Sequence, residues 1–242
     1  MKTQKIAAAI KNDLGKSETE SFLCETGLVL TEISYMLKHI KKFAKDKTVP
    51  TSLVNFPAHS YVKTSPYGNV LIMSPWNYPV LLSFTPLIDA VSAGNTVILK
   101  PSAYSPKTSD LISTLIAKYF SPEYITTVTG GRLENAALLH QKFDYIFFTG
   151  SVLVGKTVMA KASASVTPIT LELGGKSPCI IDSTANLKLA AKRLVFGKYL
   201  NVGQTCVAPD YVLIEESIKD KFIEHVKYYI SEMFGDDPIA ND

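Results

Sequence analysis

The spacing of apolar residues changes along the chain and divides it into parts of different character. Over residues 1 to about 47, apolar positions recur every three or four residues among Glu, Ser and Lys. This spacing predicts helix with one apolar stripe that packs against the rest of the protein. Residues 48–59 contain Pro50 and Pro57 and predict a linker, whereas residues 60–64 alternate like an edge strand.

From Gly68 onward, short apolar runs alternate with stretches of helical spacing. Strands are predicted for four runs, at residues 70–73, 96–99, 124–128 and 145–148. Helices are predicted between them, at residues 80–93, at residues 108–119 and after Gly130 and Gly131. This alternation indicates an α/β fold with a parallel sheet covered on both faces. Ligands bind such sheets beyond the carboxyl ends of the strands, so the loops that follow the strands are the candidate binding positions.

The composition fits a globular enzyme and argues against a nucleic-acid partner. The 242 residues are 46% hydrophobic and 19% charged, which is enough to bury a sizeable core in one large or two modest domains. The net charge of +3 is small, and no run rich in Lys and Arg carries interleaved aromatic residues. The local concentration of lysines from Lys38 to Lys47 is interpreted as the solvated face and end of a helix.

The three cysteines, Cys24, Cys179 and Cys206, are sparse, and their spacing fits neither a disulfide pair nor a metal site. This usage suits a reducing compartment. The N-terminus lacks the apolar segment of a signal peptide, and no apolar run approaches the length of a membrane span. We therefore expect cytoplasmic residence and no membrane span.

Two segments carry candidate chemistry. The first, Leu171-Glu172-Leu173-Gly174-Gly175-Lys176, puts a carboxylate on an otherwise apolar strand beside two glycines. The second, Gly203-Gln204-Thr205-Cys206, puts a thiol on a loop between a predicted helix at 187–199 and a predicted strand at 211–214. A cysteine nucleophile and a glutamate that activates water are the minimum needed to form and hydrolyse a thioester. Taken singly, a lone cysteine is usually inert, and such a glutamate is usually exposed and paired with a lysine such as Lys176.

In this order, the two segments resemble the Glu-Leu-Gly-Gly-Lys and Gly-Gln-x-Cys motifs of the aldehyde dehydrogenase superfamily. Trp76-Asn77, Lys100 and Gly150-Ser151 also follow the family order, so the resemblance covers residues 68–214. The longer runs Glu-Leu-Gly-Gly-Lys-Ser-Pro-Cys and Gly-Gln-Thr-Cys-Val-Ala-Pro-Asp are most similar to the class 3-like branch, which acts on fatty or aromatic aldehydes. No histidine lies in these motifs, which disfavours a Cys-His hydrolase.

The resemblance implies a Rossmann-type, doubly wound cofactor domain and a catalytic centre of three residues. Cys206 would attack the aldehyde, the Asn77 amide and the Cys206 N–H would stabilise the oxyanion, and Glu172 would activate the water that hydrolyses the thioester. Apolar neighbours on the strand are expected to bury Glu172 and strengthen it as a base near neutral pH. Without the resemblance, Asn77 would be interpreted as a turn residue.

The resemblance also implies NAD or NADP as cofactor. Lys100 matches a lysine that binds the adenosine ribose, and Gly150-Ser151 opens a helix whose free N–H groups attract pyrophosphate. Alone, these residues would be an ordinary exposed lysine and a helix cap. Ala103 stands where many NAD-preferring relatives have Glu. Without that carboxylate, the site would not repel the 2′-phosphate of NADP, so NADP would be tolerated. The predicted cofactor-binding residues are Trp76, Lys100, Ser102, Gly150, Ser151, Gly155, Leu173 and Gly174.

Three parts are expected along the chain. Residues 1–59 form a helical segment on the cofactor domain, residues 60–173 form the dinucleotide-binding domain, and residues 174–242 begin a second α/β, catalytic domain. Because family members are about twice this length, the chain is interpreted as an N-terminal half, and full-length relatives are expected to form dimers. The expected partner is a small aliphatic or aromatic aldehyde. The alternatives are a non-catalytic dinucleotide-binding fragment and a CoA-acylating aldehyde dehydrogenase.

Overall fold

The structure, a computed structural model, describes residues 2–237. Contacts between residues divide the chain into two units, Met1–Glu172 and Leu173–Asp242. Each unit has its own hydrophobic core.

The first unit is built on a five-stranded sheet with the order β5-β4-β3-β6-β7. The pairs β3–β4, β3–β6 and β4–β5 are parallel, which confirms the predicted doubly wound sheet. The strands are β3 (Asn69–Met73), β4 (Thr96–Lys100), β5 (Ile125–Thr127), β6 (Tyr145–Gly150) and β7 (Ile169–Leu173). The connecting helices are α4 (Leu81–Ser92), α5 (Pro106–Tyr119), α6 (Arg132–Leu139) and α7 (Val152–Ser163).

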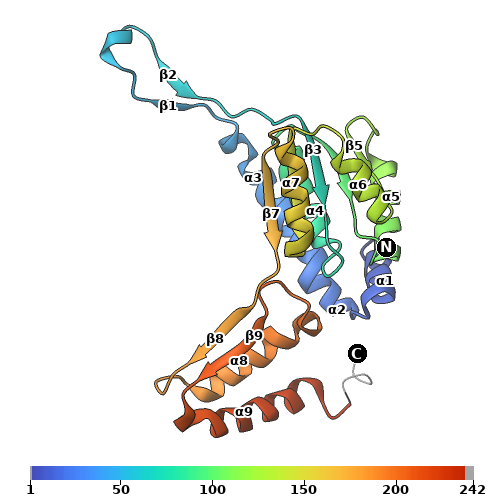
Figure 1. The fold of residues 1–242 in the computed structure, drawn as a ribbon, viewed down its shortest axis with the longest axis vertical. Coiled ribbons are helices and arrows are strands. Elements are labelled where there is room, and N and C mark those ends of the chain that lie inside the picture. The colour runs from blue at the N-terminus through green and yellow to red at the C-terminus, as the bar shows by residue number, and fades with distance from the viewer. Residues whose placement is uncertain (1, 238–242) are drawn as a thin grey trace. The chain divides into compact units, whose positions relative to one another are not determined.

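Aliphatic side chains on one face of the sheet form the core with α4 and α5. Burial of each such side chain contributes about 1.5–3 kcal/mol of free energy to folding. Figure 1 shows α7 on the side of the sheet that faces the viewer. The buried members of the core are Val70, Ile72, Leu87, Val97, Leu99, Ile112, Ile116 and Ile125.

The predicted N-terminal helix is broken into several elements. Gly15 adopts a φ of 72°, which L-residues with side chains rarely adopt, so the first helix ends there. Ser17 then caps the next helix, because its Oγ accepts a hydrogen bond from the backbone N–H of Glu20 at 3.1 Å. The elements are α1 (Lys2–Leu14), α2 (Glu18–Ser21), a π-helical turn (Phe22–Thr26) and α3 (Gly27–Phe43).

A small hairpin occupies the segment predicted as a linker. Strand β1 (Lys47–Val49) pairs antiparallel with β2 (Ser60–Val62), and a 3-10 turn (Leu53–Asn55) lies between them. The strand predicted at residues 60–64 is therefore present, but the linker prediction over residues 48–59 was wrong at its start. Strand β1 has only three residues, which are too few for an alternation of apolar and polar residues to be recognised.

The second unit packs two helices on a two-stranded parallel sheet. Its elements are β8 (Ser177–Ile181), α8 (Leu187–Tyr199), a 3-10 segment (Leu200–Gly203), β9 (Pro209–Ile214) and α9 (Glu216–Phe234). The buried residues of its core are Ile181, Ala191, Val195, Phe222 and Tyr229. Parallel strands joined through a helix match the expected beginning of an α/β domain.

Candidate active site

Three loops that carry predicted site residues meet at one edge of the sheet in the first unit. They follow β4, β3 and β6, which are neighbouring parallel strands, so their carboxyl ends lie at the same edge. The loop after β3 carries Trp76 and Asn77, Lys100 ends β4, and Ser151 follows β6. The structure therefore brings the residues predicted for the oxyanion and for the cofactor to one side of the sheet.

The loop from Ser74 to Val80 is anchored where it leaves the sheet. The Ser74 backbone N–H donates to the Lys100 carbonyl at 3.1 Å, and the Ser74 and Ser83 hydroxyl groups form a buried hydrogen bond of 2.7 Å. Prolines at positions 75 and 79 restrict the backbone on both sides of Asn77. Asn77 itself is half-buried. Its side-chain amide extends from a loop whose backbone is restricted on both sides.

A buried ion pair, which the sequence pattern did not reveal, contacts this loop. The Lys16 ammonium lies 2.7 Å from the Glu25 carboxylate, and both side chains are almost completely inaccessible to solvent. Lys16 also donates to the backbone carbonyl of Asn77 at 2.9 Å. Burial raises the pKa of Glu25, while Lys16 and the backbone N–H groups of Val80 and Leu81 oppose the shift. The helical spacing of residues 1–47 predicts only an apolar packing stripe here and gives no sign of buried charges.

Lys100 is buried rather than an ordinary exposed lysine. Its ammonium donates to the carbonyl groups of Pro101 at 2.9 Å and Gly130 at 2.6 Å. Burial lowers the pKa of Lys100, and the nearby Glu134 carboxylate opposes that shift. An ammonium has three N–H groups, so a ribose hydroxyl can be added to these two partners.

Ser102, predicted to bind the cofactor, lies on the loop after Lys100 and is half-buried. Its hydroxyl accepts a hydrogen bond from the Tyr104 backbone N–H at 3.2 Å, and its carbonyl accepts one from Ser109 at 2.6 Å. These bonds fix the loop and connect it to α5.

The entry to α7 has the features of an anion site. Ser151 is the N-cap residue, and its Oγ accepts from the Val154 backbone N–H at 3.3 Å. A Cβ atom at Gly150 would lie 2.6 Å from the Phe148 ring, so a larger residue there would require the ring to move. Gly155 is buried one turn further along the helix. The first backbone N–H groups of α7, at the positive end of its dipole, suit a pyrophosphate group.

Glu172 does not have the buried environment that was expected. It lies near the end of the edge strand β7, and its side chain is exposed, whereas its strand neighbours are half-buried. Figure 1 shows β7 running in the same direction as β3, so Glu172 is at the carboxyl edge of the sheet. The prediction of burial was wrong because β7 is an edge strand of the sheet in this unit, and none of its residues is fully buried.

Cys206 lies on a turn between α8 and β9 in the second unit, at the loop position predicted for it, and its side chain is exposed. The turn follows Asn201 and Val202, which adopt left-handed φ angles of 52° and 56°. Asn201 is buried, and its side chain donates to the Gln204 carbonyl at 3.2 Å, while the Gln204 amide donates back to the Asn201 carbonyl at 3.0 Å. These reciprocal bonds close the segment just before the cysteine.

The two glycines of the Glu-Leu-Gly-Gly-Lys motif differ in their surroundings. A Cβ atom at Gly174 would enter open space, but one at Gly175 would lie 3.2 Å from the Cys206 carbonyl oxygen. Gly175 therefore permits a close approach between its segment and the cysteine turn. Lys176, the partner considered for Glu172, instead pairs with Asp210 at 3.2 Å.

The predicted site residues thus fall into two groups. Asn77, Glu172 and most cofactor-binding residues belong to the first unit, whereas Leu173, Gly174 and Cys206 belong to the second. The convergence of Cys206 with Asn77 and Glu172 stays a prediction. Cys24 and Cys179 are half-buried, in contrast to Cys206.

Neither a membrane span nor a metal cluster is found among residues 2–237. Their helices are too short or too polar to cross a bilayer. The same residues contain no group of three or more His, Cys, Asp or Glu side chains that would hold a metal ion.

Comparison with known proteins gives the family. The sequence profile of the aldehyde dehydrogenase family matches residues 1–242, and the chain belongs to this family. The chain is 43% identical to aldehyde dehydrogenase family 3 member H1 of Arabidopsis thaliana over 98% of its own length and 49% of that protein. It is 43% identical to the Rattus norvegicus protein named "Aldehyde dehydrogenase, dimeric NADP-preferring", over 96% of its own length and 51% of that protein.

The fold agrees with the sequence comparison. A solved structure titled "Substrate bound state of Staphylococcus Aureus AldH" superposes with a TM-score of 0.93 and 44% identity, and covers 99% of this chain and 55% of that one. The chain spans about half the length of the curated relatives it matches. The resemblance found from the motifs, including its class 3-like character, is thereby confirmed.

Proposed function

We propose that this chain carries the catalytic cysteine and the cofactor-binding half of an enzyme that oxidises an aldehyde to a carboxylic acid. The observation that carries the proposal is the exposed thiol of Cys206, on a turn within the Gly-Gln-Thr-Cys motif of an aldehyde dehydrogenase family member. An exposed cysteine on a constrained turn is accessible both to an aldehyde and to the water that later releases the product.

In the proposed reaction, the Cys206 thiolate attacks the aldehyde carbon and forms a thiohemiacetal. The Asn77 amide and the Cys206 backbone N–H donate hydrogen bonds to the negative oxygen. The chemistry that NAD or NADP would supply when bound is acceptance of the hydride from this carbon, which would leave a thioester on Cys206. Glu172 then removes a proton from water, which attacks the thioester, releases the acid and regenerates the thiolate.

The carboxyl edge of the sheet fits a dinucleotide. The α7 N-terminus, where Gly150 lacks a Cβ atom and Ser151 caps the helix, would hold the pyrophosphate. Lys100 would bind the ribose, and Trp76, Ser102, Gly155, Leu173 and Gly174 are the further residues proposed to bind the cofactor.

Either NAD or NADP is proposed as the cofactor. Ala103 is exposed beside the Lys100 loop and brings no carboxylate to repel a 2′-phosphate. The rat relative named NADP-preferring supports this choice, and its name also supports a dimer. The variant Ala103→Glu is expected to weaken NADP binding more than NAD binding, which titration calorimetry would measure.

The test mixes the chain with an aliphatic or an aromatic aldehyde and either cofactor, and follows the absorbance of the reduced nicotinamide. Cys206→Ser is expected to abolish the reaction, whereas the control Cys179→Ser, at a half-buried cysteine, retains it. Cofactor binding without reduction would favour the non-catalytic fragment. Turnover that requires CoA and survives Glu172→Gln would favour the CoA-acylating enzyme.

A further inference from the structure

Two buried charges in the N-terminal helices contact the loop that carries Asn77. Lys16 lies between α1 and α2, and Glu25 lies in the π-helical turn before α3. Their side chains form an ion pair of 2.7 Å, and both are almost completely inaccessible to solvent. Burying an ion pair costs desolvation free energy, and the pair often adds little or nothing to stability. Stability alone therefore does not account for the pair.

The ion pair contacts the chain at Asn77 and again three residues later, at Val80. On one side, the Lys16 ammonium donates to the Asn77 carbonyl at 2.9 Å and lies 4.1 Å from the centre of the Tyr78 ring. On the other side, the second oxygen of Glu25 accepts from the backbone N–H groups of Val80 at 2.8 Å and Leu81 at 3.4 Å. The pair thus holds the peptide group of Asn77 and the first turn of α4 at once.

The geometry of the loop depends on both charges. The Asn77 carbonyl is fixed by Lys16, and three residues later the chain is fixed by Glu25. At its other end, the loop is tied to β4 through Ser74 and Lys100. With these points fixed, the Cα–Cβ bond of Asn77 has a defined direction, as an oxyanion donor requires.

We propose that Lys16 and Glu25 are positioning residues that set the orientation of the Asn77 amide for the oxyanion. The proposal rests on the proposed function, because it assigns to Asn77 the oxyanion role. Neither charge touches substrate or cofactor in this proposal. Both act through the backbone of residues 77–81.

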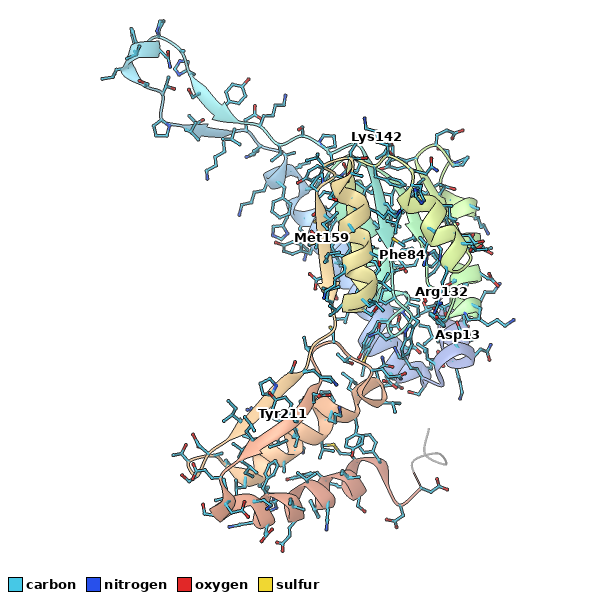
Figure 2. All side chains as sticks on the ribbon, in the orientation of Figure 1. Asp13, Phe84, Arg132, Lys142, Met159 and Tyr211 are labelled. Carbon is cyan, nitrogen blue, oxygen red and sulfur yellow. The ribbon has the colours of Figure 1, made fainter. Side chains whose placement is uncertain are left out.

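A purely structural role is the competing explanation, and the chain offers a matched control. Asp13, labelled in Figure 2, also reaches from α1 to the first turn of another helix, α5. Its carboxylate accepts from the backbone N–H groups of Lys107 at 3.1 Å and Thr108 at 2.7 Å. Like Glu25, Asp13 is a carboxylate that accepts hydrogen bonds from backbone N–H groups at the start of a helix. The hydrogen bonds found for Asp13 go to α5 and not to residues 74–80.

The central variant is Lys16→Met/Glu25→Leu, which removes both charges together. Replacing a buried pair with apolar residues of similar size is often tolerated, whereas removing one partner leaves an unpaired charge. We expect the double variant to fold, with kcat reduced about tenfold or more and KM nearly unchanged, because a displaced donor costs transition-state stabilisation. Asp13→Asn is expected to keep kcat within about twofold, because the Asn77 loop is not affected.

A cycle with Asn77→Ala tests whether the pair acts through the amide. In the Asn77→Ala background, the double variant is expected to cause no further loss of kcat, because the group that it positions is absent. An equal loss in both backgrounds, or an unchanged kcat of the double variant in the presence of Asn77, would overturn the proposal.

A second readout does not require turnover. NMR of the chain would compare hydrogen exchange at the amides of Val80 and Leu81 and the relaxation of the Asn77 side-chain amide. The double variant is expected to speed exchange by about tenfold and to increase motion of the Asn77 amide, whereas Asp13→Asn leaves both as in the wild type. If the wild-type chain does not turn over, the proposed function fails for this chain, and the NMR result alone decides the positioning proposal. Unchanged Asn77 motion in the folded double variant would contradict it.

Discussion

The loop that carries Asn77 and the loop that carries Cys206 are supported by different interactions. The Asn77 loop is half-buried, follows a central strand, and is held by the ion pair of Lys16 and Glu25. The Cys206 turn is exposed, and the segment before it is closed by amide and backbone hydrogen bonds between Asn201 and Gln204. One loop is fixed by buried charge, and the other by local backbone geometry.

This difference matches the two chemical tasks proposed for the loops. A donor to an oxyanion stabilises a transition state only when it is already in place, because reorientation during the reaction would cost free energy. A nucleophilic thiol must instead admit an aldehyde, form a covalent bond and then admit water. Rigid support suits the first task, and exposure suits the second. Four changes test this contrast, from the largest expected effect to the smallest.

Removing one partner of the ion pair should destabilise the first unit strongly. Glu25→Ala leaves the Lys16 ammonium buried without its carboxylate, and such changes cost about 3–5 kcal/mol of unfolding free energy. Urea unfolding followed by the fluorescence of Trp76, the single tryptophan, would measure the loss. Gln204→Ala, which removes an amide bond near the cysteine, should cost only about 1 kcal/mol. Equal losses at the two sites would remove the contrast between the loops.

Lys100→Met should weaken cofactor binding, because it removes a buried donor at the edge that also carries the Asn77 loop. We expect the Kd for NAD and NADP to rise about tenfold, which corresponds to about 1.4 kcal/mol. Titration calorimetry would measure both constants. Lys118→Met, at an exposed lysine of α5, is the control and should leave them unchanged. Unchanged binding by Lys100→Met would remove Lys100 from the cofactor site.

The Cys206 loop contains strain that can be relieved. Val202 has a φ of 56°, which is unfavourable for a β-branched residue, and its side chain is exposed. Asn adopts this conformation more readily, so Val202→Asn should increase the free energy of unfolding by about 1 kcal/mol. The same substitution at exposed Val207 should not stabilise the protein. Thermal unfolding followed by circular dichroism would compare the two variants.

Asp89, a carboxyl group near the end of α4, should give the smallest effect. Partial burial, together with the Glu32 carboxylate, raises the pKa of Asp89 to about 6 from 3.8. The raised pKa favours the protonated form of Asp89 in the folded state. The stability that protonated Asp89 contributes is therefore complete below pH 3.8 and is lost as the pH rises through about 6. The Asp89 side chain is nevertheless exposed, so solvent screens the interaction and the effect on stability is small.

The variant Asp89→Asn should therefore stabilise the chain slightly at neutral pH and flatten its stability between pH 4 and 6. Urea midpoints measured across this range would show it, with Asp110→Asn, at an exposed carboxylate of α5, as the control. A stability difference between Asp89→Asn and the wild type that does not change with pH would contradict the assignment.

The sequence predicted the parts of this fold that depend on local pattern. The apolar runs that became β3, β4 and β6 were recognised because strands buried on both faces are continuous and apolar. The helix predicted at 187–199 is α8, and the thiol before β9 is on the exposed turn expected for it. Ser151 lies at the start of α7 because a short polar side chain caps a helix through local bonds alone.

The features that the sequence did not predict depend on contacts between distant residues. Lys16 and Glu25 are buried because the first helix ends before Gly15, where the chain turns. Both side chains then pack against a loop some sixty residues further along the sequence. No spacing in the helical pattern marks such a pair. Glu172 was expected to be buried, but exposure on β7 depends on which elements cover the strand, which alternation alone does not give.

The most direct measurement of the proposed chemistry is to identify the acyl group on the enzyme. With Glu172→Gln, an aldehyde and the cofactor, we expect one equivalent of reduced nicotinamide per chain and then a stop, because the thioester forms but is not hydrolysed. Acid quenching and mass spectrometry of peptides should then find the acyl group on Cys206. Absence of reduced nicotinamide, or an acyl group on Cys24 or Cys179 instead, would contradict the account.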